Sequence, residues 1–481
     1  MIVLAVILLT VSLVRYSRIR SSFPSGMAIA GVPVGGINPQ QATNRLLQVY
    51  ASAIELRSGE TIIQIKPSSL GFELDLENMM AAADLERVAQ PFWQGFWDNL
   101  WGRSKNTMDI PLRSVISEDT LRQFLEYEIA ARFDQPSTPP VPVPGRTDFP
   151  AGQPGMTLDI DRAVTDISNA LVSATNRVVF LVYQEDAAPR PTLQNLEILL
   201  KQNIQSSDFE GLIEIYMKDL QTNQTIHFAY QADQAATIEP NIPFSALSTL
   251  KIPVMVSAYR RLSEPVLPTV MTLMAEMIDK SDNDSTDLLA QTVLDKNLAP
   301  ILVTDDMKSL GLVNTFWAGF FYQGAALLRI YETPANMRPD VTTEPEIYDQ
   351  TTPADLGMLL EDIYQCSQTG GGALVAVFPG EITQAECQQM VSLLAANKIA
   401  VLIQAGVSSD AQVAHKHGWA VDVTDGVIHT MADAALIYSP GGDYVLTIFL
   451  YDPVQVVFDP VNLMVAQLSQ AIYNYFNIPA Q

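Results

Sequence analysis

The chain has 481 residues, of which 48% are hydrophobic and 17% are charged, and its formal net charge at pH 7 is −25. This length allows two or three domains, and the hydrophobic content is sufficient for substantial cores. A strongly acidic chain without a basic stripe repels phosphate backbones. We therefore expect no nucleic-acid partner.

The N-terminal residues 1–20 combine a short apolar run with arginines. Met1–Val14 is apolar apart from two hydroxyl residues, and Arg15, Arg18 and Arg20 follow it. The run is shorter than the roughly 20 residues that a spanning helix needs. A signal peptide carries positive charge before its apolar run, and here the arginines follow the run. Arginines on this side also do not fit an N-terminus inside the cell under the positive-inside rule. We expect the remainder of a membrane anchor whose start lies upstream, with a buried N-terminal helix as the alternative.

Residues 26–190 are expected to form a small α+β domain. Ile29–Glu77 predicts a strand, a helix that starts with proline after Asn38, and two alternating strands. Gly155–Tyr183 predicts a strand, a helix and another strand. The patterns GVPVGG and LDID in these segments resemble VanW-type proteins. The resemblance implies a peptidoglycan-binding domain, and a spacer between the membrane and the next domain is the alternative.

An aromatic segment, FWQGFWDNLWGR at Phe92–Arg103, lies between these halves. Its large apolar residues recur at helical spacing, and three of the five tryptophans are here. Such a stripe is more often core than surface, so we expect it to be buried. A helix on the membrane interface or on glycan is the alternative. Residues 136–146 are rich in proline and predict a stiff connector.

The most informative pattern for function is STLK at residues 248–251, within the largely apolar run Phe244–Val254. Positions three residues apart share a face of a helix, so the Lys251 amine can reach the Ser248 hydroxyl. Burial disfavours the charged form of a lysine and makes its amine a base that can activate a serine. A chance pairing of serine and lysine on an ordinary helix is the alternative.

Two further motifs follow in order, SDN at 281–283 and KHG at 416–418. Together with STLK they resemble the three signatures of penicillin-recognising serine enzymes, S-x-x-K, S-D-N and K-T-G. The hairpin pattern of residues 209–229 and TTP at 351–353 also resemble class A β-lactamases. The resemblance covers residues 195–481. It implies an antiparallel sheet packed by helices, with the site between the sheet and an all-helical part.

The resemblance also implies catalytic roles. Ser248 would attack the substrate carbonyl, Lys251 would take its proton, and Ser281 would pass a proton to the leaving nitrogen. The backbone N–H groups of Ser248 and Trp419 would form the oxyanion hole, where one donor is worth about 3–4 kcal/mol in the transition state.

Substrate-binding roles follow in the same way. Asn283 would bind the amide of the substrate side chain and orient Lys251. Lys416 would hold the substrate carboxylate and keep the Lys251 pKa low. His417 takes the place of a hydroxyl residue that helps to bind the carboxylate. Gly418 would let the substrate lie close to the strand.

Three features depart from the family pattern. His417 is bulkier than the residue it replaces, which puts specificity in question. The interval between the first two motifs is shorter than in class A enzymes, and the next interval is longer. The deacylating glutamate is expected near Asn336, whereas Glu332, Glu344 and Glu346 are all displaced. Without that base, water attacks an acyl-enzyme slowly.

Cysteine and histidine are rare. Cys366 and Cys387 lie on predicted helices separated by a glycine-rich loop, and one disulfide or two buried thiols would explain them equally. His415 and His417 flank a lysine, and His429 lies nearby without a carboxylate cluster. We expect no metal and no cofactor.

The resulting interpretation is an α+β multidomain protein, anchored by residues 1–20 at the extracytoplasmic face of a bacterial cell. Residues 195–481 would form a serine β-lactamase-like hydrolase that acts on β-lactams through an acyl-serine intermediate. The alternatives are a D,D-peptidase acting on peptidoglycan stem peptides and a non-catalytic wall-binding protein with a degenerate hydrolase domain. The expected partners are a β-lactam or stem peptide, cell-wall glycan, and the membrane.

Overall fold

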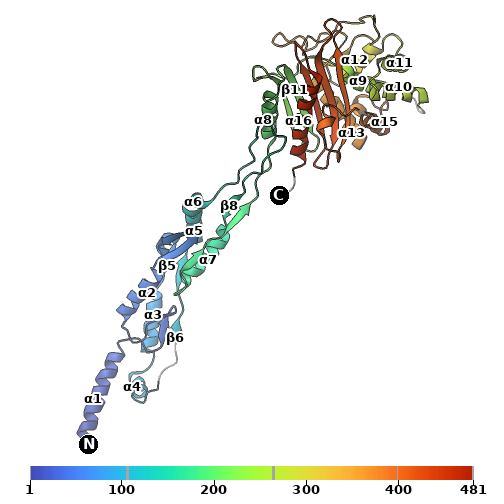
Figure 1. The fold of residues 1–481 in the computed structure, drawn as a ribbon. Coiled ribbons are helices and arrows are strands. Elements are labelled where there is room, and N and C mark those ends of the chain that lie inside the picture. The colour runs from blue at the N-terminus through green and yellow to red at the C-terminus, as the bar shows by residue number, and fades with distance from the viewer. Residues whose placement is uncertain (1, 104–107, 263–265, 398, 479–481) are drawn as a thin grey trace. The chain divides into compact units, whose positions relative to one another are not determined.

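The chain forms two compact units, each with its own hydrophobic core. The computed structural model describes residues 2–103, 108–262, 266–397 and 399–478. Figure 1 shows the course of the chain. Unit 1 contains Met1–Thr138 and Gly152–Pro189, and unit 2 contains Pro139–Ala151 and Arg190–Gln481.

Unit 1 consists of short helices and strands. Its helices are α1 (Ile2–Ile19), α2 (Pro39–Tyr50), α3 (Leu76–Val88), α4 (Phe92–Leu100), α5 (Glu118–Phe124), α6 (Ala131–Phe133) and α7 (Ile160–Val172), with a 3₁₀ turn η1 (Pro67–Leu70) and a π-helical segment η2 (Leu125–Ala130). Its strands are β1 (Met27–Ile29), β2 (Val32–Pro33), β3 (Ile54–Ser58), β4 (Thr61–Ile65), β5 (Phe72–Leu74), β6 (Met108–Ile110), β7 (Ser114–Ile116), β8 (Gly155–Leu158), β9 (Val178–Phe180) and β10 (Tyr183–Asp186). They form small sheets of order β2-β1-β6, β4-β3-β9, β5-β7 and β10-β8.

The predicted element orders in unit 1 are confirmed. The Asn38 side chain accepts the backbone N–H of Gln41, and the Gln41 side chain accepts that of Asn38. This capping box explains why α2 begins at Pro39. The second half contributes β8, α7 and β9, and β9 pairs in parallel with β3 of the first half. The resemblance to VanW-type proteins and the peptidoglycan-binding role stay predictions.

The helix expected near the N-terminus is α1. Its apolar side chains are mostly exposed, so the alternative of a buried N-terminal helix is wrong. None of the helices in the described residues combines the length and the apolarity that crossing a bilayer requires. The membrane anchor expected at residues 1–20 stays a prediction.

Helix α4 differs from its prediction. Phe96 is buried, but Trp93, Trp97 and Trp101 are 62%, 47% and 72% exposed. The prediction of a buried stripe is therefore wrong for the tryptophans. The physical reason is that only one side of this short helix packs against other elements, through Gly95 and Phe96.

Unit 2 is larger and combines one main sheet with two layers of helices. Its helices are α8 (Leu193–Gln205), α9 (Lys251–Tyr259), α10 (Pro268–Asp279), α11 (Asn283–Val293), α12 (Ala299–Ser309), α13 (Pro353–Thr369), α14 (Ala373–Val377), α15 (Gln384–Ala395) and α16 (Phe458–Phe476), with 3₁₀ turns η3 (Leu247–Leu250) and η4 (Gln404–Gly406). Its strands are β11 (Leu212–Asp219), β12 (Thr225–Gln231), β13 (Ala236–Ile238), β14 (Phe244–Ser245), β15 (Phe316–Trp317), β16 (Asp349–Thr351), β17 (Gln412–Val421), β18 (Ile428–Tyr438) and β19 (Tyr444–Tyr451).

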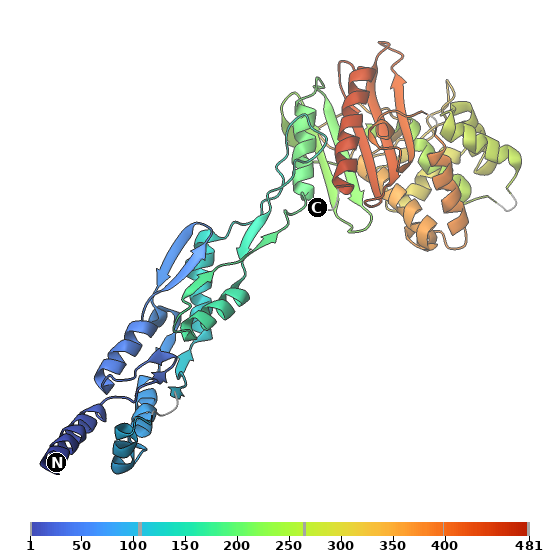
Figure 2. The same cartoon turned by 60° about the horizontal axis from the view of Figure 1, so that its bottom comes forward.

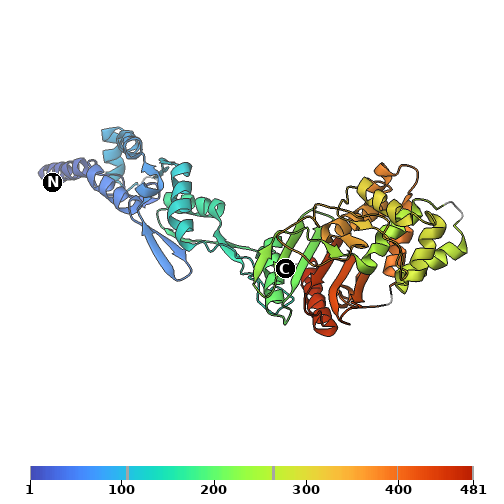
Figure 3. The same cartoon turned by 90° about the horizontal axis from the view of Figure 1, so that it is seen from above.

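The main sheet is antiparallel, with the strand order β13-β12-β11-β19-β18-β17. Helices α8 and α16 pack on one face, side by side in Figure 2. On the other face, α13 and α15 pack against the strands, and α9 to α12 and α14 pack with them in one hydrophobic core. Figure 3 shows these helices gathered on one side of the sheet. The expected antiparallel sheet flanked by helices is therefore present. Strand β17 lies at the edge, which leaves one of its sides free for a site.

Other local predictions in unit 2 are confirmed. β11 and β12 form the predicted hairpin, with Asn223 in the left-handed conformation at its turn. Helix α13 begins at Pro353, and its N-cap Thr352 accepts the N–H of Asp355. Cys366 on α13 and Cys387 on α15 form a disulfide, which decides between the two alternatives left open by the sequence.

Candidate active site

The site begins where the turn η3 leads into α9. Ser248 lies in η3, and Lys251 is the first residue of α9. A 3₁₀ turn places residues i and i+3 on the same side, and the Lys251 Nζ donates to the Ser248 Oγ at 3.0 Å. Lys251 is fully buried, and its amine is 4.9 Å from the centre of the Phe321 ring, whereas Ser248 is partly exposed. The solvent-accessible Ser248 hydroxyl is thus hydrogen-bonded to the buried Lys251 amine.

The second motif reaches the same place from the loop before α11. Ser281 adopts the left-handed conformation and its Oγ donates to the Ser248 Oγ at 2.7 Å. Asn283 begins α11, and its Oδ1 accepts from the Lys251 Nζ at 2.7 Å. Asp282 caps α11 by accepting the N–H of Ser285, which indicates a structural role for this carboxylate.

The third motif contributes Lys416 from the edge strand β17. The Lys416 Nζ donates to the Ser281 Oγ at 2.9 Å, and the side chain is fully buried. Residues from three separate parts of the sequence thus form one hydrogen-bond network, which runs from Lys416 through Ser281 to Ser248. The Ser248 oxygen also accepts from Lys251, so a nucleophile has a potential base on one side and a potential proton donor on the other.

The pKa values of Lys251 and Lys416 are both lowered, which favours their neutral amines. Burial lowers the pKa of Lys251 to about 8, although three nearby carboxylates raise it. Burial, and then the charge of Lys251, lower the pKa of Lys416 to about 7. Burial is thus the main cause for both lysines. A neutral amine beside Ser248 is therefore accessible near neutral pH, as a general base requires.

Gly418 brings strand β17 against the Ser248 turn. A Cβ at this position would lie only 2.7 Å from the Ser248 nitrogen and 2.9 Å from the Leu247 Cβ, so a larger residue would push the strand and the turn apart. Trp419 is the next residue along the same strand. The backbone at these positions therefore borders Ser248.

His417 lies on the other face of β17. Side chains alternate along a strand, and the His417 ring stacks on Trp419 at 4.9 Å, while Trp419 contacts Phe458 of α16. The Asn397 amide lies 3.4 Å from the His417 Nδ1. Burial is the main cause that lowers the pKa of His417 to about 4, so the ring is neutral. The structure thus does not bring this side chain together with Lys416 and Gly418.

Asp349, which the sequence analysis did not single out, stabilises the turn that contains Ser248. The Asp349 Oδ1 accepts the backbone N–H of Leu247 at 2.9 Å, and Leu247 adopts a positive φ of 54° directly before Ser248. Burial, and then the charge of Glu346, raise the pKa of Asp349 well above its usual range, and the two carboxyl groups are hydrogen-bonded. The only sequence signal was its place next to QTTP.

Two of the glutamates considered for deacylation lie close to the turn that contains Ser248. Glu344 and Glu346 line a cavity of about 450 Å³ that also borders Leu247 and Ala420. Asn336, at the expected position of the base, donates to the Gln350 side chain. Within the described residues, the hydrogen bonds of Ser248, Lys251 and Ser281 go to groups other than carboxylates: the oxygens of Ser248, Ser281 and Asn283 and the amines of Lys251 and Lys416.

The remaining histidines of the third motif region have structural partners. His415 is buried, with Nδ1 3.0 Å from Asp433 and Nε2 2.9 Å from Gln404. His429 bonds to Asp425 on an adjacent turn. In the part of the chain that the structure describes, no group of three or more His, Cys, Asp or Glu side chains is arranged to hold a metal ion.

Comparison with known proteins shows which family part of unit 2 is similar to. Residues 261–476 match the model of the family described as Beta-lactamase enzyme family. This part of the chain is therefore a β-lactamase-like serine hydrolase domain. The match contains Ser281, Asn283 and Lys416 but begins after Ser248 and Lys251. No curated protein sequence matches the chain.

Several solved structures are similar to unit 2. PBP-A is 18% identical, with 60% of this chain and 98% of that chain covered and a TM-score of 0.42. A β-lactamase from Xanthomonas campestris pv. campestris is 17% identical, with 58% and 96% covered and a TM-score of 0.40. A β-lactamase from Sphaerobacter thermophilus is 16% identical, with 60% and 100% covered and a TM-score of 0.41. At these values the similarities carry no argument about activity or substrate.

The close approach at Gly418 predicts a large effect of one methyl group. We expect Gly418→Ala to lower the rate at which Ser248 reacts with a penicillin by about 100-fold, because the new Cβ must displace the Ser248 turn. Gly371→Ala is the matched control, since its Cβ would meet nothing closer than 3.4 Å. Stopped-flow acylation kinetics measure the rates, and equal rates for the two variants would contradict the prediction.

The buried acid predicts a pH dependence of stability. Because the Asp349 pKa is raised on folding, the folded state binds more protons than the unfolded state above pH about 4, so the free energy of unfolding falls as pH rises. Asp349→Asn cannot ionise but can still accept from Leu247. In urea unfolding, we expect the free energy of unfolding of Asp349→Asn to fall less, as pH rises from about 5 to about 8, than that of the wild type. The exposed-site control Asp459→Asn should keep the wild-type slope, and an equal slope in Asp349→Asn would refute the prediction.

Proposed function

We propose that the chain is a serine hydrolase that opens β-lactams through an acyl-enzyme on Ser248. The observation that carries this proposal is the double hydrogen bond on the Ser248 Oγ, from the Lys251 Nζ at 3.0 Å and the Ser281 Oγ at 2.7 Å. A serine becomes a useful nucleophile when a base of suitable pKa is within hydrogen-bond distance. The burial that lowers the pKa of Lys251 to about 8 supplies that property.

The acylation step follows from these contacts. The Ser248 oxygen attacks the lactam carbonyl carbon as its proton moves to the neutral Lys251 amine. The carbon–nitrogen bond then breaks, and the leaving nitrogen takes the proton of the Ser281 hydroxyl. Lys416 donates to Ser281 and can replace that proton. The backbone N–H groups of Ser248 and Trp419 are the proposed donors to the developing oxyanion.

Substrate binding is proposed for the groups that surround this chain. Lys416, when charged, would attract the substrate carboxylate, and Asn283 would bind an amide of the substrate side chain. Gly418 would leave room for the substrate beside β17. His417 would not contact the carboxylate directly, because its ring stacks on Trp419. It would act instead as a neutral packing residue behind the strand.

We also propose an extracytoplasmic location on a bacterial cell. The Cys366–Cys387 disulfide supports it, because disulfides persist mainly in oxidising compartments. A catalytic unit outside the cytoplasm would meet β-lactams and peptidoglycan stem peptides alike. The fate of the acyl-enzyme distinguishes these two substrate classes.

Acylation predicts a covalent adduct. Intact-mass spectrometry after mixing with a penicillin should show a mass gain equal to that of the penicillin, in the wild type and in Ser309→Ala at an exposed serine, but not in Ser248→Ala. A persistent adduct would indicate a penicillin-binding peptidase, and a transient adduct with opened penicillin a β-lactamase. Unchanged protein with unchanged penicillin would contradict acyl-serine chemistry.

The lysine pKa predicts the direction of the pH dependence. At saturating β-lactam the acylation rate should increase with pH from about pH 6 to about pH 8, because only the neutral Lys251 amine accepts the Ser248 proton and its pKa is about 8. Lys416, whose pKa is about 7, loses its charge over the same range, so binding of the substrate carboxylate should weaken and KM should rise. An unperturbed Lys251 would shift the rise in the acylation rate by more than two pH units upward. Single-turnover kinetics with a chromogenic β-lactam measure the profile. A flat profile, or a rise only near pH 10.5, would argue against Lys251 as the base.

A further inference from the structure

The N-terminal end of unit 1 exposes more apolar surface than its fold requires. The buried core of unit 1 includes no described side chain of α1 or α4. Trp93, Trp97 and Trp101 are about half to three-quarters exposed on α4 and its C-cap. Exposed aliphatic side chains cover α1, namely Val3, Leu4, Val6, Ile7, Leu8, Leu9, Val11, Val14 and Ile19. We call these side chains together the α1–α4 surface.

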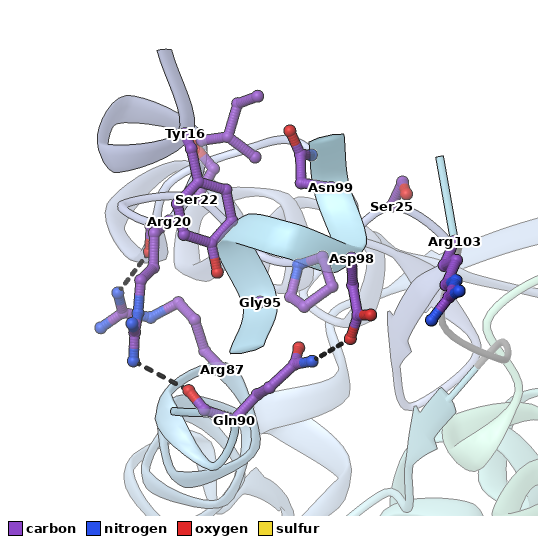
Figure 4. A pocket seen from close by; sticks show the side chains of 12 residues that line it. Tyr16, Arg20, Ser22, Ser25, Arg87, Gln90, Gly95, Asp98, Asn99 and Arg103 are labelled. Atoms are coloured by element: carbon purple, nitrogen blue, oxygen red, sulfur yellow. Dashed lines mark hydrogen bonds between the residues drawn. The ribbon is translucent and has the colours of Figure 1, made fainter. Parts of the chain in front are cut away.

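Helices α1 and α4 are held together, so their exposed apolar side chains lie at the same end of unit 1. The Tyr16 ring packs edge-on against Phe92 and Phe96 at 5.4 and 5.7 Å. Gly95 admits this ring, because a Cβ there would fall 2.0 Å from the Tyr16 hydroxyl. The Arg20 guanidinium donates to the Gln90 carbonyl. Figures 1 and 2 show α4 beside α1, and Figure 4 shows Tyr16 over Gly95.

Positive charge borders the apolar side chains. Residues 1–54 contain four arginines and neither Asp nor Glu, in a chain with a net charge of −25. Arg15 and Arg18 are exposed near the end of α1, and Arg103 is exposed just after α4. Arg20, Arg87 and Arg103 also line a cavity of about 150 Å³ between α1 and α4, together with one acid, Asp98, as Figure 4 shows. This charge favours an anionic partner.

We propose that the α1–α4 surface docks onto an anionic lipid bilayer, with α4 in the headgroup region. The aliphatic side chains of α1 would enter the acyl-chain boundary. Tryptophan prefers the membrane–water interface because its ring is amphipathic. Arginines at the same level bind lipid phosphates, and the two contributions add in interfacial helices. This proposal is independent of the chemistry at Ser248.

Vesicle binding of the full chain tests the proposal. Three of the five tryptophans lie exposed on α4 and its C-cap, whereas Trp317 is fully buried and Trp419 is half-buried, so contact quenching of tryptophan fluorescence reports mainly on this surface. The chain should float with vesicles of phosphatidylcholine and phosphatidylglycerol more than with phosphatidylcholine alone. Lipids brominated on the acyl chain should quench its fluorescence. Arg15→Gln with Arg18→Gln should reduce the preference for the anionic vesicles.

A triple variant isolates the role of α4. Replacing Trp93, Trp97 and Trp101 with serine should weaken flotation with the anionic vesicles by at least about tenfold. Phe180→Ser, at an exposed aromatic residue of unit 1 outside this surface, should bind as the wild type does. Thermal unfolding shows whether each variant is folded.

Three outcomes would overturn the proposal. Vesicle binding without bromolipid quenching would place α4 away from the lipid. Equal binding to zwitterionic and anionic vesicles would remove the role of the arginines. Lipid-free self-association that protects the tryptophans from iodide quenching would show that a second copy covers the surface.

Discussion

The candidate site depends on the burial of two lysine amines, Lys251 and Lys416, in one hydrogen-bond network. Removing an ammonium group from water is costly unless polar partners replace the water. The oxygens of Ser248, Ser281 and Asn283 are those partners, and burial still lowers both lysine pKa values. The arrangement therefore serves folding and reactivity together. The same desolvation that destabilises the charged amines brings a neutral amine within reach of a nucleophile near neutral pH.

The Ser248 turn is held from two sides by neighbouring strands. Asp349 of β16 accepts the Leu247 N–H, which secures a backbone conformation that leucine adopts only at some energetic cost. Gly418 of β17 lies against the Ser248 nitrogen. A nucleophile fixed by sheet strands loses little orientational entropy when it reacts, and that is a general requirement of efficient catalysis. The edge position of β17 keeps this place open to a substrate.

Unit 1 shows a different balance between sequence pattern and packing. Its core is complete without α1 and α4, and the tryptophans of α4 remain in solvent. Helical periodicity marks which residues share a face, but it does not say whether another element covers that face. The arginines around the two helices make this exposed surface chemically different from the acidic remainder of the chain.

The sequence by itself determined the local elements and the names of the reactive residues. Local signals predicted α2 and the β11–β12 hairpin, because a proline at a helix start and alternation along strands act between residues close in the chain. The three motifs named Ser248, Lys251, Ser281, Asn283 and Lys416 through a family resemblance. Only tertiary structure could bring these residues within hydrogen-bond distance, since the motifs are far apart in the chain.

Tertiary packing also decided what the sequence left open or predicted wrongly. It paired Cys366 with Cys387, exposed the α4 tryptophans, and turned His417 away from the Ser248 face of β17. It also placed Asp349 under the Ser248 turn. Each of these results depends on which element lies across from a side chain, and that is set by long-range burial rather than by neighbours in the sequence.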